Sequence, residues 1–310
     1  MSKVCFGVDV GGTTVKLGLF QADGQVMDKW EIVTRTQEKG KHILPDIAAS
    51  IQAKISEKAI EIQDVAGVGI GVPGPVKEDG TVLNAVNLGW GIFNVANELE
   101  KLTHLKVKAG NDANVAALGE MWQGGGRGSK NVVMITLGTG VGGGIIHNGE
   151  IITGTNGAGG EVGHIHVEDS ETDTCGCGKK GCLEQMASAT GVVRLAKKAL
   201  ELSDSPSLLR NGEISAKAVF DAVKENDALA ISVAEQFGKY LGTALANVAA
   251  VTDPEVFVIG GGVSKAGSIL IDYIKKYYVL RAFAACKETK FSLAELGNDA
   301  GIFGAAKLVL

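Results

Sequence analysis

The chain has 310 residues, a length at which one hydrophobic core usually gives way to more than one folded unit. Its composition, 45% hydrophobic and 21% charged, excludes a disordered chain, and 30 basic residues against 35 acidic ones (net charge −5) argue against a nucleic-acid-binding surface. The 44 glycines accompany only 5 prolines, so they indicate tight turns in a folded protein and not a collagen-like repeat.

No targeting or membrane signal is recognisable in the sequence. Residues 1–3 lead directly into a strand pattern without the cationic and apolar regions of a signal peptide. The longest stretch without a formal charge, 131–149, contains too many glycines and polar residues to stay apolar across a bilayer. We therefore expect a cytoplasmic protein with no membrane partner and no nucleic-acid partner.

The chain opens with a predicted β-meander. Apolar residues and glycine alternate over Lys3–Val10, Gly11–Thr14 interrupts the pattern, and Val15–Phe20 resumes it. A third strand is predicted over Gln25–Thr34, where bulky and β-branched residues recur at short even spacings. This start predicts a strand, a glycine-rich turn and two further strands.

Strands and helices alternate farther along the chain, which predicts an α/β layered fold. A helix is indicated by Ile47, Ile51 and Ile55, and an apolar strand at Val65–Val72 ends in Pro73-Gly74-Pro75. Downstream, further helices and a buried strand are predicted at Gly191–Leu202, Ser215–Lys224, Ala228–Val251, Glu255–Ile259 (the strand), Ser268–Phe283 and Ala300–Leu310.

The opening pattern of a strand, a glycine-rich turn and a second strand recurs in the middle of the chain. Val132–Leu137 reads as a strand, Gly138–Gly143 as a glycine-rich turn and Gly144–Ile146 as a second strand, followed by a hairpin turn at His147–Glu150. A spacing of this size is too long for a solenoid repeat and indicates two related lobes with a shared cleft. The boundary is predicted near Gly124–Gly126.

The first glycine turn has the character of a phosphate-binding loop. Gly11, Gly12, Thr13 and Thr14 offer backbone N–H groups and hydroxyls without bulky side chains in the way. The carboxylate of Asp9 would repel a phosphate unless Mg²⁺ lay between them, as in many ATP sites. A plain hairpin turn is the alternative at this point.

Two common nucleotide motifs are not supported. Gly138–Gly143 matches G-x-G-x-x-G, but a hairpin pattern follows it where a dinucleotide fingerprint needs a helix. No G-x-x-x-x-G-K-[ST] sequence occurs, which excludes a P-loop. A third loop, Gly260-Gly261-Gly262, follows a predicted strand and could let an adenosine ring approach the backbone.

A cysteine cluster predicts a metal site. Cys175, Cys177 and Cys182 have C-x-C-x₄-C spacing on a glycine-rich segment, and zinc needs a fourth ligand that either His164 or His166 could supply. A closed four-ligand site is structural, so Zn²⁺ should shape the site and not perform the chemistry.

Asp112 is a candidate catalytic base. It lies in Gly110-Asn111-Asp112-Ala113-Asn114, just before a predicted helix that ends at Gly124. A helix N-terminus keeps a carboxylate ionised and able to accept a proton, but the same position suits an N-cap. Glu161 and Glu184, on either side of the cysteine cluster, are further acidic candidates.

The glycine loops, Glu161-Val162-Gly163-His164 and the C-x-C-G-x-x-G-C segment from Cys175 to Cys182 together resemble the ROK family of sugar kinases and repressors. The resemblance covers nearly the whole chain. It implies an α/β, two-lobed, actin-like (ribonuclease H-like) sugar-kinase fold with a central cleft for ATP and sugar. The lobes would be 1–120 with the C-terminal helix 298–310, and 121–297.

The resemblance also implies roles for individual residues. Asp112 would be the general base for the 6-hydroxyl of the hexose, which we expect to be glucose, and His164 would bind zinc and also contact the sugar. Mg²⁺ would bridge the ATP phosphates near Asp9. The remaining implied contacts are to the sugar, from Gly74, Asn111, Glu161 and Glu184, and to ATP, from Gly11, Gly12, Thr13, Thr14, Lys16, Gly138, Thr139, Gly140, Gly260, Gly261 and Gly262.

Alternatives within and beyond this family stay open. The segment between His164 and Cys175 looks about one residue longer than the family's usual spacing, which leaves His166 as a competing ligand. The sugar could instead be N-acetylmannosamine, N-acetylglucosamine, fructose or allose. A sugar-sensing repressor would carry a winged helix before Asp9, and an actin-like scaffold would have no use for the sugar-side acids. The family generally forms homo-oligomers, so a dimer or tetramer is expected.

Overall fold

A computed structural model describes residues 3–310, so Met1 and Ser2, with which the predicted first lobe begins, lie outside the described residues. The chain forms two compact units. Unit 1 comprises the chain up to Lys130 together with Gly144–Gly160 and Glu295–Leu310, and unit 2 comprises Asn131–Gly143 and Glu161–Ala294. The predicted lobes placed 144–160 with the second unit, whereas the structure groups this segment with the first.

Unit 1 is built on a five-stranded mixed sheet of order β3-β2-β1-β4-β7. The predicted opening meander is confirmed, because β1 pairs with β2 and β2 pairs with β3 in antiparallel fashion, while β4 and β7 extend the sheet in parallel. The strands are β1 (Val4–Val10), β2 (Thr14–Gln21), β3 (Val26–Val33), β4 (Val65–Val72) and β7 (Val107–Asn111).

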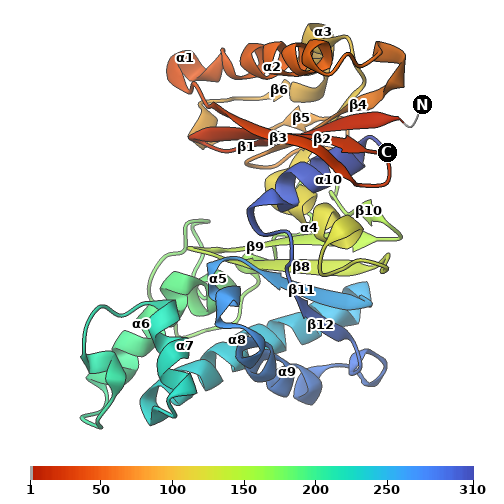
Figure 1. Ribbon diagram of the computed structural model, residues 1–310. Coiled ribbons are helices and arrows are strands. Elements are labelled where there is room, and N and C mark those ends of the chain that lie inside the picture. Colours follow the sequence, from red (N-terminus) through yellow and green to blue (C-terminus); the bar gives the residue numbers. More distant parts are fainter. Residues whose placement is uncertain (1–2) are drawn as a thin grey trace. The chain divides into compact units, whose positions relative to one another are not determined.

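Helices cover both faces of this sheet (Figure 1). One face carries α2 (Ile43–Glu57) and α3 (Val95–Thr103), and the other carries α10 (Ala300–Leu308), which packs against α4 (Asp112–Gln123). Glycines in the strands permit this contact: a Cβ at Gly7 or Gly69 would lie 1.9 or 1.6 Å from a backbone oxygen of α10. The backbone of α10 therefore packs directly against the backbones of β1 and β4.

The second sheet also has five strands, in the order β10-β9-β8-β11-β12. Strand β11 is parallel to both β8 and β12, and β10 pairs with β9 in an antiparallel hairpin. The strands are β8 (Val132–Leu137), β9 (Val141–His147), β10 (Glu150–Ile151), β11 (Val256–Gly260) and β12 (Lys290–Leu293), and a separate small pair is formed by β5 (Thr81–Val82) and β6 (Phe93–Asn94).

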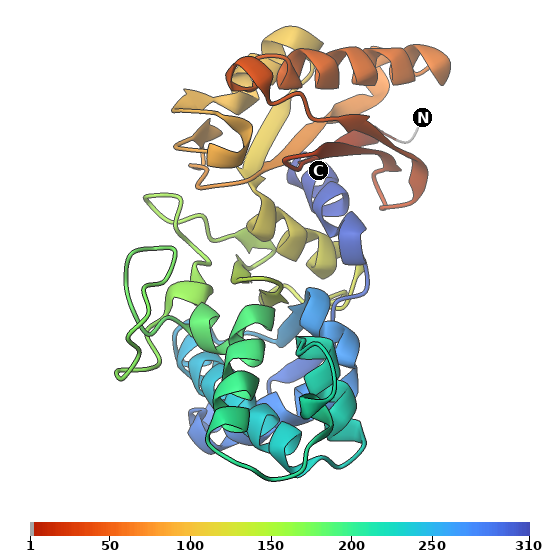
Figure 2. The same ribbon diagram turned by 90° about the vertical axis from the view of Figure 1, so that its left-hand side faces the viewer.

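Unit 2 is rich in helices, which Figure 2 shows gathered together in green and blue. The long helix α8 contacts α6, α7 and α9, and glycines at 238 and 242 let its backbone approach α9 closely. The predicted helices of this unit are confirmed within one or two residues at their ends. They are α6 (Ala189–Glu201), α7 (Ala216–Lys224), α8 (Ala228–Thr252) and α9 (Ser268–Arg281), preceded by the short α5 (Leu183–Ala187).

Some elements differ from the sequence-based prediction. The predicted glycine turn over Gly138–Gly143 is too long, since β9 already begins at Val141. Gly144, which was predicted as a strand residue, is one: a Cβ there would come within 2.5 Å of the Ala117 side chain, so the glycine lets β9 pack beside α4. The helix α3 and the strands β7 and β12 were not predicted, nor were the one-turn elements α1 (Gln37–Gly40) and α5.

Within residues 3–310, none of the helices combines the length and the apolar character needed to cross a bilayer.

Candidate active site and metal centre

The first glycine loop joins β1 to β2 in unit 1. Gly11 N donates to the Thr14 carbonyl over 3.0 Å, and the loop residues Gly11, Gly12 and Thr13 are exposed. Thr34, at the end of β3, fixes the loop from the side: its hydroxyl donates to Gly11 O at 2.8 Å and its amide to Thr13 O at 2.9 Å. Thr34 therefore holds the loop through two of the loop's own main-chain carbonyls, and the outer face of the loop stays exposed.

Two carboxylates of unit 1 lie near enough to influence each other. Burial, and after it the charge of Asp112, raises the pKa of Asp9 to about 6, against a lowering by Lys16. Lys16 faces Asp9 across the β1–β2 pair, and its ammonium group donates to the Asn298 carbonyl at 3.0 Å. At Gly301, a Cβ would lie 2.5 Å from Asp9 Oδ2, so only glycine leaves room for this carboxylate.

The N-terminus of α4 is capped by Asn111, which resolves the alternative raised for Asp112. Asn111 Oδ1 accepts from the amides of Ala113 and Asn114 at 3.0 and 3.1 Å, and its Nδ2 donates to Gly74 O at 3.0 Å. Asp112 is the first residue of the helix, and its Oδ1 accepts from Ala113 N at 2.8 Å. The structure thus brings Gly74, Asn111 and Asp112 together and gives the N-cap role to Asn111.

Two further glycine loops meet at the carboxyl ends of neighbouring parallel strands in unit 2. Gly138–Gly140 follows β8, and Gly260–Gly262 follows β11, whose Gly260 pairs with Thr136. Gly261 has a φ of 84°, and a Cβ there would lie 2.5 Å from Leu137 O, so the loops touch through main chain. This edge is where ligands bind in open α/β sheets.

The predicted metal ligands converge in unit 2. Ligand atoms of His164, Cys175, Cys177 and Cys182 all lie within 4.8 Å of one another. Cys175 Sγ lies 3.7 Å from His164 Nδ1, and the Sγ atoms of Cys177 and Cys182 are 3.6 Å apart. Ligands on a zinc tetrahedron with bonds of about 2.0–2.3 Å lie roughly 3.3–3.8 Å apart, so this Cys₃His set fits a Zn²⁺ ion.

The structure separates the two candidate histidines. His166 lies outside the cluster, where its Nδ1 is 3.0 Å from the Lys180 carbonyl and its Nε2 is 2.8 Å from Asp169 Oδ1. His164 turns Nδ1 toward the cysteines and Nε2 toward Glu161, whose Oε2 is 3.8 Å away. His164 is therefore the histidine of the Cys₃His cluster, and its second ring nitrogen faces an acid.

Glu184 connects the metal cluster with the second glycine loop. Its Oε2 accepts from Val141 N at 3.0 Å, and Cys175 Sγ lies 3.7 Å from its Oε1. A Cβ at Gly140 would come within 2.0 Å of Glu184 Oε2, so the glycine makes room for the carboxylate. Thr190 adds a second support, since its hydroxyl donates to Thr139 O at 2.8 Å.

Several supporting residues were not found from the sequence. Arg194 forms an ion pair with Glu171 and donates to the Gln185 carbonyl at 2.9 Å, and Tyr240 donates to Glu168 Oε2 at 2.5 Å. Together they anchor the long segment between His164 and Cys175 to the helices α6 and α8. These long-range contacts join residues with no motif in common, so no sequence signal points to them.

A fully buried carboxylate was also missed. Glu120, on α4, is 0% exposed and accepts from the amides of Gly125, Glu295 and Leu296 at 2.9, 3.0 and 2.9 Å. It satisfies main-chain donors where the chain leaves α4 and enters α10. The only hint in the sequence is an acid on the apolar side of a predicted helix just before a glycine run.

Comparison with known proteins places the chain in a family. The ROK family model matches residues 5–310. The chain is 46% identical to a glucokinase of Halalkalibacterium halodurans, over 98% of this chain and 94% of that protein, and 37% identical to one of Thermotoga maritima, over 98% and 96%. A ROK family glucokinase from Streptomyces griseus, solved in complex with glucose and AMPPNP, superposes with a TM-score of 0.72 at 33% identity, over 98% of both chains.

This likeness confirms the predicted fold class, a mixed α/β fold of the actin-like type found in ROK sugar kinases. With a family match over nearly its whole length, the chain belongs to the ROK family.

Proposed function

We propose that this protein is a glucokinase, which transfers the γ-phosphoryl group of ATP to the 6-hydroxyl of glucose and yields glucose 6-phosphate and ADP. The identity of 46% to a protein named glucokinase supports it, as does the fold shared with a relative that binds glucose and an ATP analogue. We place the reaction in the cytoplasm, where ATP is at hand and the five free cysteines stay reduced.

The observation that carries the proposal is the position of Asp112. It begins α4, and because Asn111 supplies the cap, the helix does not need its carboxylate as N-cap. The positive end of the helix favours the ionised carboxylate. In phosphoryl transfer such a group orients the attacking hydroxyl and accepts its proton as the new P–O bond forms.

Residues from two parts of the chain are proposed as sugar contacts. Asn111 and the carbonyl of Gly74 are already hydrogen-bonded to each other, and offer an amide and a main-chain edge to ring hydroxyls. Glu161 and the Nε2 of His164 form a pair of polar groups at 3.8 Å that can bind two adjacent hydroxyls. Glu184 completes the set, although its two oxygens also contact Val141 N and the Cys175 thiol.

The glycine loops would hold ATP. Gly11–Thr14 and Gly138–Gly140 would bind phosphates through main-chain N–H groups, with Lys16 nearby, and Gly260–Gly262 would let the adenosine approach. The hard oxygen donors at Asp9 fit Mg²⁺, which when bound neutralises charge on the β- and γ-phosphates. Asp9 would hold that ion, directly or through water.

Zinc has a structural role in this proposal. Bound by His164, Cys175, Cys177 and Cys182, it would fix the ring of His164 so that Nε2 faces the sugar. Elemental analysis of the purified protein should find about one zinc per chain. A fully active preparation without zinc would remove this role.

The test is ADP release from Mg-ATP with a panel of sugars: glucose, mannose, fructose, allose, N-acetylmannosamine and N-acetylglucosamine. Glucose should give the highest kcat/KM. A higher value with another hexose would move the substrate and leave the chemistry in place, whereas no stimulation by any sugar would refute the kinase proposal. A homo-oligomer, dimer or tetramer, is also expected from the preference of soluble proteins for closed assemblies, and light scattering checks it.

A further inference from the structure

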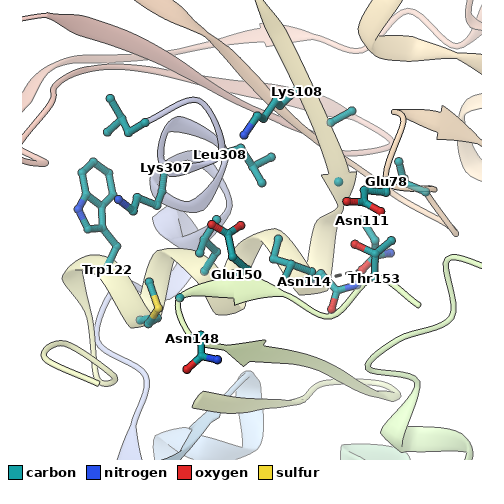
Figure 3. A pocket seen from close by; sticks show the side chains of 18 of the residues that line it. Glu78, Lys108, Asn111, Asn114, Trp122, Asn148, Glu150, Thr153, Lys307 and Leu308 are labelled. Carbon is teal, nitrogen blue, oxygen red and sulfur yellow. Dashed lines mark hydrogen bonds between the residues drawn. The ribbon is translucent and has the colours of Figure 1, made fainter. Parts of the chain in front are cut away.

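Unit 1 contains a large cleft to which the proposed chemistry assigns no role. Its volume is about 1190 Å³, and all of its lining residues belong to unit 1 (Figure 3). It runs along α4, from the cap residue Asn111 to Trp122. On one side lie β7 and the end of α10, and on the other lie the turn and loop after β9. Of the residues proposed for sugar and ATP, only Asn111 lines it.

One wall of this cleft carries an unsatisfied polar atom. Asn114 is only 4% exposed, and its Nδ2 donates to Gly159 O at 3.2 Å. Within residues 3–310, its Oδ1 is the one buried side-chain nitrogen or oxygen atom without a hydrogen-bond partner. Such an atom costs free energy unless a donor reaches it, and it belongs to a residue that lines the cleft, so a small turn of the side chain would offer it to a bound molecule.

The cleft also has an excess of positive charge. Four lysines line it against two glutamates, an excess of positive side-chain charge: Lys77, Lys108, Lys130 and Lys307 against Glu78 and Glu150. Lys307 lies over the ring of Trp122, with its ammonium nitrogen 5.7 Å from the ring centroid. Figure 3 shows Lys108 and Lys307 on the same side of the cleft, across from Glu150. A small anion is therefore the ligand that this charge pattern favours.

We propose that this cleft is a second binding site, for a small hydroxylated anion of the hexose phosphate class. The phosphate would lie between Lys108 and Lys307, where two ammonium groups can share its charge. A hydroxyl of the sugar would donate to Asn114 Oδ1 once the side chain turns toward the cleft. The volume exceeds the roughly 300–1,000 Å³ of common small-molecule sites, so a ligand of this size has room.

The experiment measures binding without turnover. Glucose 6-phosphate is the probe, because the proposed function makes it available to this protein. The proposed active site is first filled with saturating glucose and a non-hydrolysable ATP analogue, and binding is followed by equilibrium dialysis and tryptophan fluorescence. One additional glucose 6-phosphate should bind per chain and change the fluorescence of the wild type, whereas Trp122→Phe should show no such change.

Variants of the cleft decide the outcome. Lys108→Gln with Lys307→Gln should weaken binding at least tenfold, while Lys275→Gln, an exposed lysine on α9, should leave it unchanged. Asn114→Leu should weaken glucose 6-phosphate binding more than inorganic phosphate binding. No binding by the wild type, or equal binding by the double lysine variant, overturns the proposal. Equal affinity for inorganic phosphate overturns the class of ligand. Glucose turnover is measured separately, so failure of the proposed function appears in a different assay.

Discussion

Two glycine–threonine loops with similar sequences are supported in different ways. Gly11–Thr14 in unit 1 is held by Thr34, which donates to the carbonyls of Gly11 and Thr13, and Asp9 lies in the strand that leads into the loop. Gly138–Gly140 in unit 2 is followed by Val141, whose amide donates to Glu184, and Glu184 also contacts a thiol of the metal cluster. A shared pattern thus predicts a shared turn. Neighbours distant in sequence determine that only the second loop is connected to the Cys₃His cluster.

Among changes to the two loops and their supports, removal of a zinc ligand should have the largest effect. Cys175→Ser removes both a ligand and the thiol next to Glu184, so we expect loss of zinc and a fall in kcat/KM for glucose of about 10–100-fold. Zinc content and steady-state kinetics are measured together. Cys286→Ser, a buried cysteine outside the cluster, is the matched control and should keep its zinc. Full activity of the zinc-free Cys175 variant would contradict the coupling.

Substitution of a glycine in the motif Glu161–His164 should have the next-largest effect. A Cβ at Gly163 would lie 2.0 Å from the Val141 carbonyl, so the main chain must move, and Gly163→Ala should destabilise the protein by about 1–3 kcal/mol. Gly12→Ala in the first loop meets its nearest atom at 3.9 Å and should change stability by less than about 0.5 kcal/mol. Urea unfolding measures both, and equal losses would refute the argument from close approach.

The carboxylate behind the first loop should make stability depend on pH. Because the pKa of Asp9 is raised to about 6 from 3.8, the folded state holds this proton more tightly than the unfolded chain does. The contribution to stability is therefore full below about pH 4 and is lost as pH rises through about 6. Without Mg²⁺ and nucleotide, Asp9→Asn should match the wild type near pH 4 and be more stable above pH 6. A difference that does not change with pH would contradict this sign.

The smallest effect is expected at the support of the first loop. Thr34→Val removes the hydroxyl that donates to Gly11 O, a loss of about 1 kcal/mol in the free energy of unfolding. Its zinc content should be unchanged, since Thr34 belongs to unit 1. Thr190→Val is the matched change at the second loop, where the hydroxyl donates to Thr139 O. Loss of zinc from the Thr34 variant would show that the two loops are not supported independently.

Much of the fold could be predicted from local patterns. The opening strands, β4 and the helices α6 to α9 follow from alternation, helical spacing and glycine punctuation, and C-x-C-x₄-C spacing alone brings three thiols within reach of one ion. The spacing could not choose between His164 and His166, because both precede the cluster by similar distances. Only the tertiary structure shows that His166 turns to Asp169 and Lys180.

The remainder depends on contacts between distant residues. The strand β7 is short and contains Lys108, Ala109 and Gly110, so its sequence has little strand character, and parallel pairing with β4 fixes it. Val141, Gly142 and Gly143 of β9 were included in the predicted turn because a run of glycines carries no alternating signal. Arg194, Tyr240 and Glu120 act through hydrogen bonds and ion pairs to residues outside their own local patterns, which those patterns do not encode.

The central claim is that Asp112 takes the proton in a glucose kinase reaction, and Asp112→Asn tests it most directly. The side chains have nearly the same shape, and Asn111 keeps the helix cap, so glucose binding by calorimetry should stay within a few-fold of the wild type. The kcat for glucose phosphorylation should fall by about 10²–10⁴-fold, the usual contribution of general acid–base catalysis. A variant that binds glucose and retains a substantial share of the wild-type kcat would contradict the claim.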